Sequence, residues 1–546
     1  MNRATPSSDP MHATAPDTVA GLVVAAVGAR GTRRIWGLPG GGSSLDLIQA
    51  AGRCGVDFVL CRHEGSAAMM AVADAELTGA PGVVLTTKGP GLSNAANGVS
   101  CATLERAPVL LVTDGFTPAQ TGWITHQVFD QRAATAAYVK GHARCEGDDA
   151  AAELDTLLDI AAAHPRGAVH LDLTSAAAKR QARPTPRQPP PPVALTDLEP
   201  LRALLAAAHR PVLILGLEAT EAAAECRALA AALGCPVLVT YKAKGVVDDA
   251  HPQHAGIFTG GTLEAQVVSA ADLIVLVGAD PVEFILQPWR YRAPVAEIAA
   301  RPFPVHYTAI AAGAYGSIAR IAATLAEHAT PSDWRATEIA AHRAAMRDAL
   351  TWPPGGGGVA PPRIVQLAAE AAMRAGRDPR ATVDAGAHMF SATAFWPCSR
   401  PRDLLISNGL ATMGFALPAG IAAALHDPGR GAVAFTGDGG LMMCVAELAT
   451  AADQSARLVT VVFNDGALSL IDVKQQQRQL PTEGVRWGRA DFAMVAEGFG
   501  ARGFRAHDEA GLAAAFDAAF AHDGPSLVDV QVDPAGYVQQ LQAMRG

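Results

Sequence analysis

One stretch of the chain brings together a carboxylate, an amide and several glycines at a spacing that could hold a ligand. An apolar run over 432–436 leads to Asp438, and a second apolar run over 458–463 leads to Asn464. The Ala-, Leu- and Met-rich segment 441–452 between them predicts a helix, so the two runs form a βαβ unit with parallel strands. Both polar side chains are then expected at the same edge of the sheet, where open α/β sheets bind ligands. Oxygen donors beside flexible glycines suit a hard cation that holds a diphosphate.

A second carboxylate has a comparable place earlier in the chain. Glu64 follows a predicted strand over 57–62 and opens an Ala- and Met-rich helix. A glutamate at a helix N-terminus often only compensates the helix dipole. Glycine turns at 39–42 and 386–388 also follow apolar runs. At such turns the backbone can come close to a ligand, although each turn could be a plain connection. These segments are candidates for binding that need support from their context.

The elements that must position these residues form three parts. Breaks rich in proline or glycine at 183–193 and 352–362 divide the chain of 546 residues. Each part alternates short apolar runs with Ala-rich segments, which is typical of strands and helices in α/β domains. We therefore predict three doubly wound α/β domains with parallel sheets, over residues 14–182, 194–345 and 360–546.

Composition excludes several classes of function. The net charge of −9 gives no electrostatic case for nucleic-acid binding. The apolar stretch Val19–Ala29 is too short to cross a membrane and is expected to be the first helix, after a polar N-terminal tail. Eight scattered cysteines without Cys-x-x-Cys spacing are expected to be reduced. The composition thus predicts a cytoplasmic protein that binds neither nucleic acid nor membrane.

The Gly-Asp-Gly sequence at 437–439, followed by Asn464, resembles the signature of thiamine diphosphate (ThDP) enzymes. In that family the aspartate, the asparagine and the carbonyl two residues further on hold magnesium. The resemblance therefore implies Asp438, Asn464 and Gly466 as ligands of Mg²⁺. Phe463 departs from the usual Asn-Asn pair, but the ligand is the second residue of that pair. The three domains then correspond to the pyrimidine-binding, central and diphosphate-binding domains of the family.

The other candidate segments resemble acetolactate synthases within the same family. Glu64 corresponds to the glutamate that touches N1′ of the aminopyrimidine and favours the imino tautomer that activates the thiazolium carbon. Met413 corresponds to the bulky apolar residue that bends the cofactor, so that its two rings meet. The remaining cofactor contacts that the resemblance implies are Pro39, Gly40, Gly41, Pro90, Asn94, Gly386, His388, Ala411, Gly437, Gly439 and Gly440.

Three polar positions bear on the substrate. Gln127 corresponds to an active-site glutamine of acetolactate synthases, which makes it a catalytic candidate. His126 stands where Phe is common there, and is either a second proton-transfer group or a structural histidine. Lys88 replaces the usual Ser, and is either a solvated charge or a group that faces an anionic part of the substrate. The polar helix expected over 472–477 is either a determinant of substrate choice or a solvated face.

The resemblance implies a small-molecule 2-oxo acid substrate that loses CO₂ with ThDP and Mg²⁺. The sequence leaves the substrate itself open among pyruvate, a longer or aromatic 2-oxo acid, a sulfonated aldehyde and a cyclic diketone. The product is then either protonated, which gives an aldehyde, or captured by a second carbonyl, which forms a carbon–carbon bond. Leu470 stands where pyruvate decarboxylases carry an acid, which favours carboligation or an unusual lyase reaction. FAD is an open question, and its absence is favoured because 278–289 does not resemble the flavin segment of acetolactate synthases.

Two other classes compete with this interpretation. A flavin or nicotinamide oxidoreductase would explain the glycine turns but neither Glu64 nor the pairing of Asp438 with Asn464. A catalytically silent relative is a second alternative, although it would have no reason to keep both the metal ligands and the activating acid. Because the family builds each active site between two subunits, the resemblance also implies a homodimer or a homotetramer.

Overall fold

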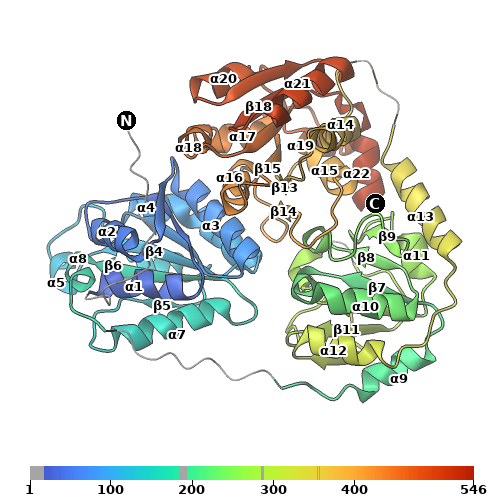
Figure 1. Cartoon of the computed structure of the whole chain (residues 1–546), viewed down its shortest axis with the longest axis horizontal. Coiled ribbons are helices and arrows are strands. Elements are labelled where there is room, and N and C mark those ends of the chain that lie inside the picture. Colours follow the sequence, from blue (N-terminus) through green and yellow to red (C-terminus); the bar gives the residue numbers. More distant parts are fainter. Residues whose placement is uncertain (1–17, 184–193, 285–287, 353–354, 356, 546) are drawn as a thin grey trace. The chain divides into compact units, whose positions relative to one another are not determined.

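The computed structural model describes residues 18–183, 194–284, 288–352, 355 and 357–545. The predicted N-terminal tail, residues 184–193 of the first spacer and parts of the second spacer lie outside the described residues. The chain divides into two compact units, Met1–Pro190 and Pro191–Gly546. The first unit contains one six-stranded sheet and the second unit contains two (Figure 1). Every strand pair is parallel, which confirms the predicted architecture of three doubly wound α/β sheets.

The sheet of the first unit has the strand order β2-β1-β3-β4-β6-β5. Helices α1, α2, α7 and α8 share one hydrophobic core on one face of it. Helices α3 and α4 pack together on the other face, where Trp36 Nε1 donates to Asp74 at 3.2 Å (Figure 1). The order reverses between β1 and β3, so their carboxyl ends form the crevice at which such sheets bind ligands. The elements are α1 (Val19–Ala29), β1 (Arg34–Leu38), α2 (Ser43–Cys54), β2 (Asp57–Leu60), α3 (Glu64–Thr78), β3 (Gly82–Thr86), α4 (Pro90–Leu104), β4 (Val109–Gly115), α5 (Pro118–Thr121), α6 (Gln131–Thr135), β5 (His142–Ala143), α7 (Ala150–Ala162), β6 (Ala168–Thr174) and α8 (Ser175–Ala178).

The first sheet of the second unit has the order β12-β11-β10-β7-β8-β9. Its strands β7 and β10 are buried along their whole length, as expected for a sheet covered on both faces. The order reverses between these two strands, which defines the crevice of this domain. Its elements are α9 (Glu199–Ala207), β7 (Pro211–Leu215), α10 (Ala223–Leu233), β8 (Val237–Val239), β9 (His254–Ile257), α11 (Ala265–Ser269), β10 (Leu273–Val277), β11 (Val295–Ala299), β12 (Ala312–Tyr315), α12 (Ile318–Ala326) and α13 (Ala336–Ala349).

The second sheet of this unit has the order β14-β13-β15-β16-β18-β17, with a reversal between β13 and β15. Helices α14, α15 and α21 pack in one large core with its strands. Its elements are α14 (Pro361–Arg374), β13 (Arg380–Val383), α15 (His388–Phe395), β14 (Leu404–Ile406), α16 (Ala416–His426), β15 (Ala432–Gly437), α17 (Asp438–Cys444), α18 (Glu447–Asp453), β16 (Leu458–Asn464), α19 (Ser469–Gln477), α20 (Phe492–Gly498), β17 (Arg502–Ala506), α21 (Glu509–Ala521), β18 (Ser526–Gln531) and α22 (Tyr537–Arg545).

One predicted helix is two helices in the structure. The segment 441–452 was expected to be continuous, but α17 ends at Cys444 and α18 begins at Glu447. Between them Leu448 N donates to Val445 O at 3.1 Å, a tighter turn than the α-helical ladder allows. Composition could not predict this break because every residue around it is compatible with a helix.

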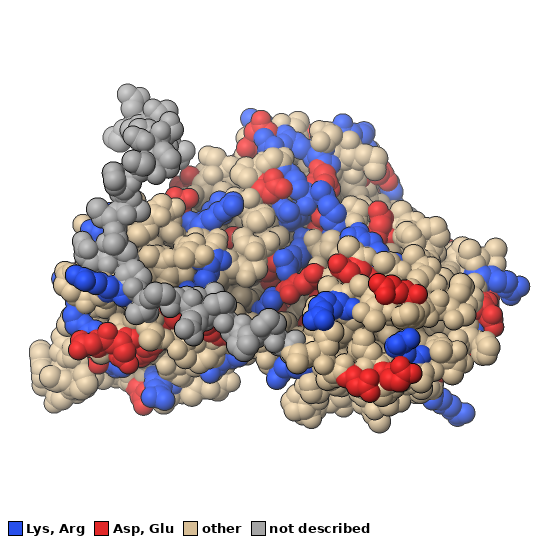
Figure 2. All heavy atoms as spheres, turned by 60° about the horizontal axis from the view of Figure 1, so that its bottom comes forward, with Lys and Arg blue, Asp and Glu red and all other residues tan. Residues whose placement is uncertain are grey.

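One face of the molecule carries charged side chains of both signs. On the face in Figure 2, acidic and basic side chains are mixed rather than gathered into areas of one sign. Among the residues described, no helix combines the length and the apolar character that crossing a bilayer requires.

Candidate cofactor site

The structure brings the two predicted strand ends together. Asp438 begins α17 directly after β15, and its side chain is 2% exposed. Its Oδ1 accepts a hydrogen bond from Gly439 N, and its Oδ2 accepts one from Gly466 N, each at 2.8 Å. The carboxylate is therefore fixed against the loop that follows β16. Burial, and then the charge of nearby Asp465, raise the pKa of Asp438 to about 6. A cation at this point would favour its charged form.

Asn464 presents a free oxygen at the end of the neighbouring strand. Its Nδ2 donates to Ala490 O at 3.0 Å and to Asp529 Oδ1 at 2.9 Å. Its Oδ1 is buried and has no hydrogen-bond partner among the residues described. A buried acceptor without a partner is costly unless something binds it. An oxygen of this kind beside a carboxylate fits Mg²⁺, which prefers oxygen ligands.

The Gly466 carbonyl, the third predicted ligand, lies at the neck of a closed loop. Trp487 N donates to Gly466 O at 2.9 Å, and Leu468 N donates to Val485 O at 2.8 Å. The carbonyl keeps a second lone pair for another partner. The φ of Gly466 is +72°, and a Cβ there would lie 2.9 Å from Trp487 O, so glycine is needed at this position. The loop between these two neck bonds contains α19.

The imidazole of His388 faces the same region. It is buried and stacks on Phe463, with ring centroids 5.2 Å apart. Burial lowers the pKa of His388 to about 4, so the ring is neutral near pH 7. Its Nε2 is buried and has no partner among the described residues, which fits a ring nitrogen available to a diphosphate oxygen. Phe463, which departs from the usual Asn, has a structural purpose as the stacking surface of this ring.

A cavity of about 630 Å³ in the second unit collects most of the predicted cofactor residues. Its wall includes Leu470 and, from the central domain, Phe284 and Tyr307. Asn464 and Gly466 do not line this cavity, although Asp465 between them does, and Gly466 N donates to Asp438 in its lining. The predicted residues in its lining are Gly386, His388, Ala411, Met413, Gly437, Asp438, Gly439 and Gly440. Ala411 has a φ of +54°, which lies in the left-handed region that favours glycine.

Asp384 organises this cavity, and sequence reasoning gave it no role. It is fully buried at the end of β13 and accepts hydrogen bonds from Ala416 N at 2.6 Å, Thr436 Oγ1 at 2.6 Å and Gly414 N at 3.1 Å. A single carboxylate thus ties together three segments that carry predicted cofactor residues. The signal available in the sequence was an aspartate at a strand end directly before the 386–388 turn.

Gly440 lies against this carboxylate and allows a test of the arrangement. A Cβ at Gly440 would lie 2.3 Å from Asp384 Oδ2. We expect Gly440→Ala to destabilise the protein by about 1–3 kcal/mol, since the interior must shift to admit the methyl group. The urea midpoint of unfolding measures the change. Gly488→Ala is the control, because a Cβ there meets nothing within 4 Å and should leave the midpoint unchanged.

The first unit holds the predicted activating acid. Glu64 is the first residue of α3, 9% exposed, after a cap in which Gly65 N donates to His63 Nδ1 at 3.0 Å. Asn94 Nδ2 from α4 donates to Glu64 Oε2 at 3.0 Å. A Cβ at Gly91, one residue after Pro90, would lie 3.4 Å from Glu64 Oε1. The structure therefore joins Glu64 to the start of α4, which carries the predicted cofactor contacts Pro90 and Asn94.

The turn 39–41 lies at the crevice of this first sheet. Pro39 and Gly41 are exposed, and Gly40 packs so closely that a Cβ there would lie 2.2 Å from Asp114 Oδ2. Ser44 N in turn donates to Asp114 Oδ1 at 2.8 Å, which fixes the start of α2. The glycines follow β1 and α4 follows β3, and these are the two strands between which the order reverses.

The catalytic candidates on the loop after α5 have different surroundings. Gln127 has a φ of +60°, an uncommon conformation for a residue other than glycine, and it lines a cavity of about 590 Å³. His126 is exposed and is not among the residues that line this cavity.

In the polar helix after Asn464, Asp472 is buried and pairs with Arg486 at 2.6 Å, so it supports the loop rather than facing substrate.

The fold and these residues define a class of protein, and comparison with known proteins agrees. Models of the N-terminal, central and C-terminal domains of thiamine pyrophosphate enzymes match residues 17–134, 198–327 and 384–530. Together the matches cover most of the chain, in the predicted order. The chain belongs to the thiamine pyrophosphate (ThDP) enzymes.

Individual relatives within this class differ in their reactions. The chain is 29% identical to acetolactate synthase isozyme 2 large subunit of Escherichia coli, over 94% of this chain and 95% of that one. It is 28% identical to a probable 2-ketoarginine decarboxylase of Pseudomonas aeruginosa, over 92% and 91%. A solved ThDP-dependent 4-hydroxybenzoylformate decarboxylase of Rhodococcus jostii shares the fold, with a TM-score of 0.79, 21% identity, and coverage of 94% and 99%.

Proposed function

We propose that the protein uses ThDP and Mg²⁺ to decarboxylate a small 2-oxo acid, and that it joins the resulting fragment to a second carbonyl, as acetolactate synthases do. The observation that carries this proposal is the unpartnered Asn464 Oδ1 beside the Asp438 carboxylate, together with a buried glutamate held by Asn94. An oxidoreductase would need neither feature.

In this proposal residues of this chain bind the cation, bind the cofactor and activate it. Asp438, Asn464 and the Gly466 carbonyl would hold the cation, while His388 and the backbone of Gly386 would hold the diphosphate. Met413, which lines the cavity, would pack against the cofactor. Bound ThDP would supply an electron sink for the electron pair left behind when CO₂ leaves the substrate. Glu64 holds a proton at N1′ of the pyrimidine, which promotes activation of the cofactor.

The second carbonyl distinguishes the reaction from simple decarboxylation. Leu470 lines the cavity and cannot donate a proton there. An apolar wall at this point disfavours protonation of the fragment that remains after CO₂ leaves. Addition of this fragment to a second carbonyl is then the favoured outcome. The alternative is a decarboxylase that releases an aldehyde. The similarity to the probable 2-ketoarginine decarboxylase supports this alternative. Gln127 and His126 are the candidates for proton transfer in either case.

We further propose that the enzyme needs no flavin. Dinucleotides bind at the reversal of strand order, here between β7 and β10. Glu283 occupies that crevice: its Oε2 accepts hydrogen bonds from Leu217 N at 2.8 Å and Asp280 N at 3.1 Å. These are the backbone donors that a pyrophosphate would use. A visible absorption spectrum of the purified protein without a flavin band is the expected result.

The assembly follows from the same reasoning. Glu64 belongs to the first compact unit and the metal ligands belong to the second. We propose a homodimer or a homotetramer with active sites between subunits, and domain limits at 14–182, 194–345 and 360–546.

A panel of 2-oxo acids tests the reaction. Purified protein is freed of cofactor, supplied with ThDP and Mg²⁺, and assayed for CO₂ with and without acceptor aldehydes or 2-oxo acids. CO₂ release with a hydroxy-ketone product supports carboligation, while CO₂ with only an aldehyde supports the alternative. No CO₂ from any 2-oxo acid would refute both.

A further inference from the structure

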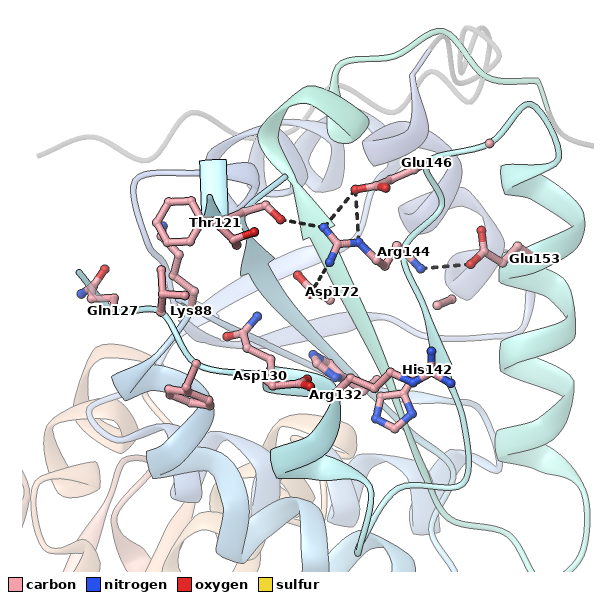
Figure 3. A pocket seen from close by; sticks show the side chains of 17 residues that line it. Lys88, Thr121, Gln127, Asp130, Arg132, His142, Arg144, Glu146, Glu153 and Asp172 are labelled. Carbon is pink, nitrogen blue, oxygen red and sulfur yellow. Dashed lines mark hydrogen bonds and ion pairs between the residues drawn. The ribbon is translucent and has the colours of Figure 1, made fainter. Parts of the chain in front are cut away.

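The cavity in the first unit contains a cation that the proposed chemistry does not use (Figure 3). Lys88 lies in the loop between β3 and α4, and lines this cavity with Gln127, Thr121 and Phe116. In Figure 3, Lys88 and Gln127 lie at one end of the cavity, and Glu146 and Glu153 lie at the opposite end. The volume of about 590 Å³ is enough for a small organic acid.

The acids that line this cavity have other partners. Arg144 binds Glu146 at 3.0 Å and Asp172 at 3.2 Å. Glu153 accepts hydrogen bonds from the backbone of residues 144 and 145 at 3.0 Å. Asp130 caps α6, where its Oδ1 accepts from Ala133 N at 2.9 Å. None of these acids forms an ion pair with Lys88.

Lys88 forms no ion pair or hydrogen bond with any residue that the structure describes. Its Nζ lies 4.8 Å from the centroid of the Phe116 ring, a weak contact that leaves its donors free. Phe116 is itself held, because its carbonyl accepts a hydrogen bond from Arg144 at 2.7 Å. A half-buried ammonium over an aromatic face, with three open donors, can bind an anion well.

Hydrogen bonds and close packing fix the loop that carries Lys88. Gly89 N donates to Gln131 Oε1 at 3.1 Å, and Gln131 Nε2 donates to Asp114 O at 3.1 Å. A Cβ at Gly89 would lie 3.1 Å from the Gln127 side chain, so these two residues pack directly. The strained backbone of Gln127 is therefore held against this loop, and strain of this kind concentrates at functional sites.

The same loop leads into the part of α4 that binds the activating acid. Pro90 begins α4, and Asn94 in its second turn donates to Glu64. Lys88 thus lies in the loop directly before the helix whose Asn94 holds Glu64 in place. An anion on Lys88 would belong to a molecule that reaches toward the Glu64 end of the proposed active site.

We propose that Lys88 binds a second carboxylate of the substrate, so that the preferred substrate is a 2-oxo acid with another acid group in place of a neutral side chain. This inference rests on the proposed function. Gln127, whose amide can donate a hydrogen bond, accompanies Lys88 at the same end of the cavity. Lys88 is then a residue that determines specificity, and the reaction itself is unchanged.

The test compares 2-oxoglutarate with 2-oxopentanoate, which has the same chain length and no second charge. We expect the holoenzyme to prefer the diacid by about tenfold or more in kcat/KM, the size of a charge-assisted hydrogen bond. Lys88→Met should remove this preference and Lys88→Arg should keep it. Arg132→Met is the matched control, because Arg132 is an exposed cation that lines the same cavity. It should leave the ratio of the two kcat/KM values unchanged.

A binding measurement separates this inference from catalysis. Calorimetry with glutarate, an unreactive diacid, should give binding to the wild-type holoenzyme that Lys88→Met weakens by about tenfold. If the wild type releases CO₂ equally well from both 2-oxo acids, Lys88 has no such role while the proposed function stands. If it releases CO₂ from no 2-oxo acid at all, the proposed function fails and this inference fails with it.

Discussion

Replacing Glu64 with Gln is expected to lower kcat by about 10²- to 10⁴-fold while ThDP still binds. The amide has the same shape as the carboxyl group, and its oxygen can still accept the hydrogen bond from Asn94 that is 3.0 Å long in the structure. It cannot exchange a proton with N1′ of the pyrimidine, so activation of the cofactor should be lost. Steady-state CO₂ release gives kcat, and calorimetry gives the affinity for ThDP.

The control is a glutamate in the same kind of position without the proposed role. Glu199 begins α9 and is exposed. Glu199→Gln removes a charge from the first turn of a helix as Glu64→Gln does, but should leave kcat unchanged. Wild-type turnover in Glu64→Gln would show that the acid serves only the helix dipole.

Replacing Asp438 with Asn is expected to weaken ThDP binding by at least about 100-fold and to abolish its dependence on magnesium. The carboxylate is the only charged member of the proposed ligand set, and Asn keeps its volume. One oxygen can still accept a hydrogen bond from Gly439 or Gly466, so the fold should survive. Calorimetric titration with ThDP, in magnesium and in a chelator, measures both effects.

Two comparisons make this result interpretable. Chelator should reduce the wild type to the affinity of the variant, because both lack the bound cation. Asp517→Asn, at an exposed carboxylate that pairs with Arg374, should bind ThDP as the wild type does. Equal ThDP affinity in Asp438→Asn and wild type would mean that Asp438 does not hold a metal ion.

The parts of this site that sequence reasoning reached are those whose position follows from a strand end. Asp438, Asn464 and Gly386 each follow an apolar run, and parallel strands bring their carboxyl ends to one edge. The three parallel sheets could be predicted for the same reason. The α17–α18 break was missed, since composition alone does not distinguish one helix from two short ones.

The walls of the cofactor cavity were beyond sequence reasoning. Phe284, Tyr307 and Arg545 reach it from distant parts of the chain, and no periodicity relates them to Asp438. The role of Asp384 could not be predicted for a different reason. It depends on three hydrogen bonds to segments that are separate in sequence. Such residues depend on tertiary packing, which a linear pattern does not encode.

The closed loop after β16 has one more consequence. It starts and returns at the Gly466 carbonyl, and α19, which contributes Leu470 to the cavity, lies wholly inside it. The position of Leu470 in the cavity wall therefore depends on Gly466, the proposed ligand of the ion. A substitution at Trp487 that leaves its backbone bond intact should be neutral in this respect, whereas a shift of Gly466 should change cation affinity and substrate preference together.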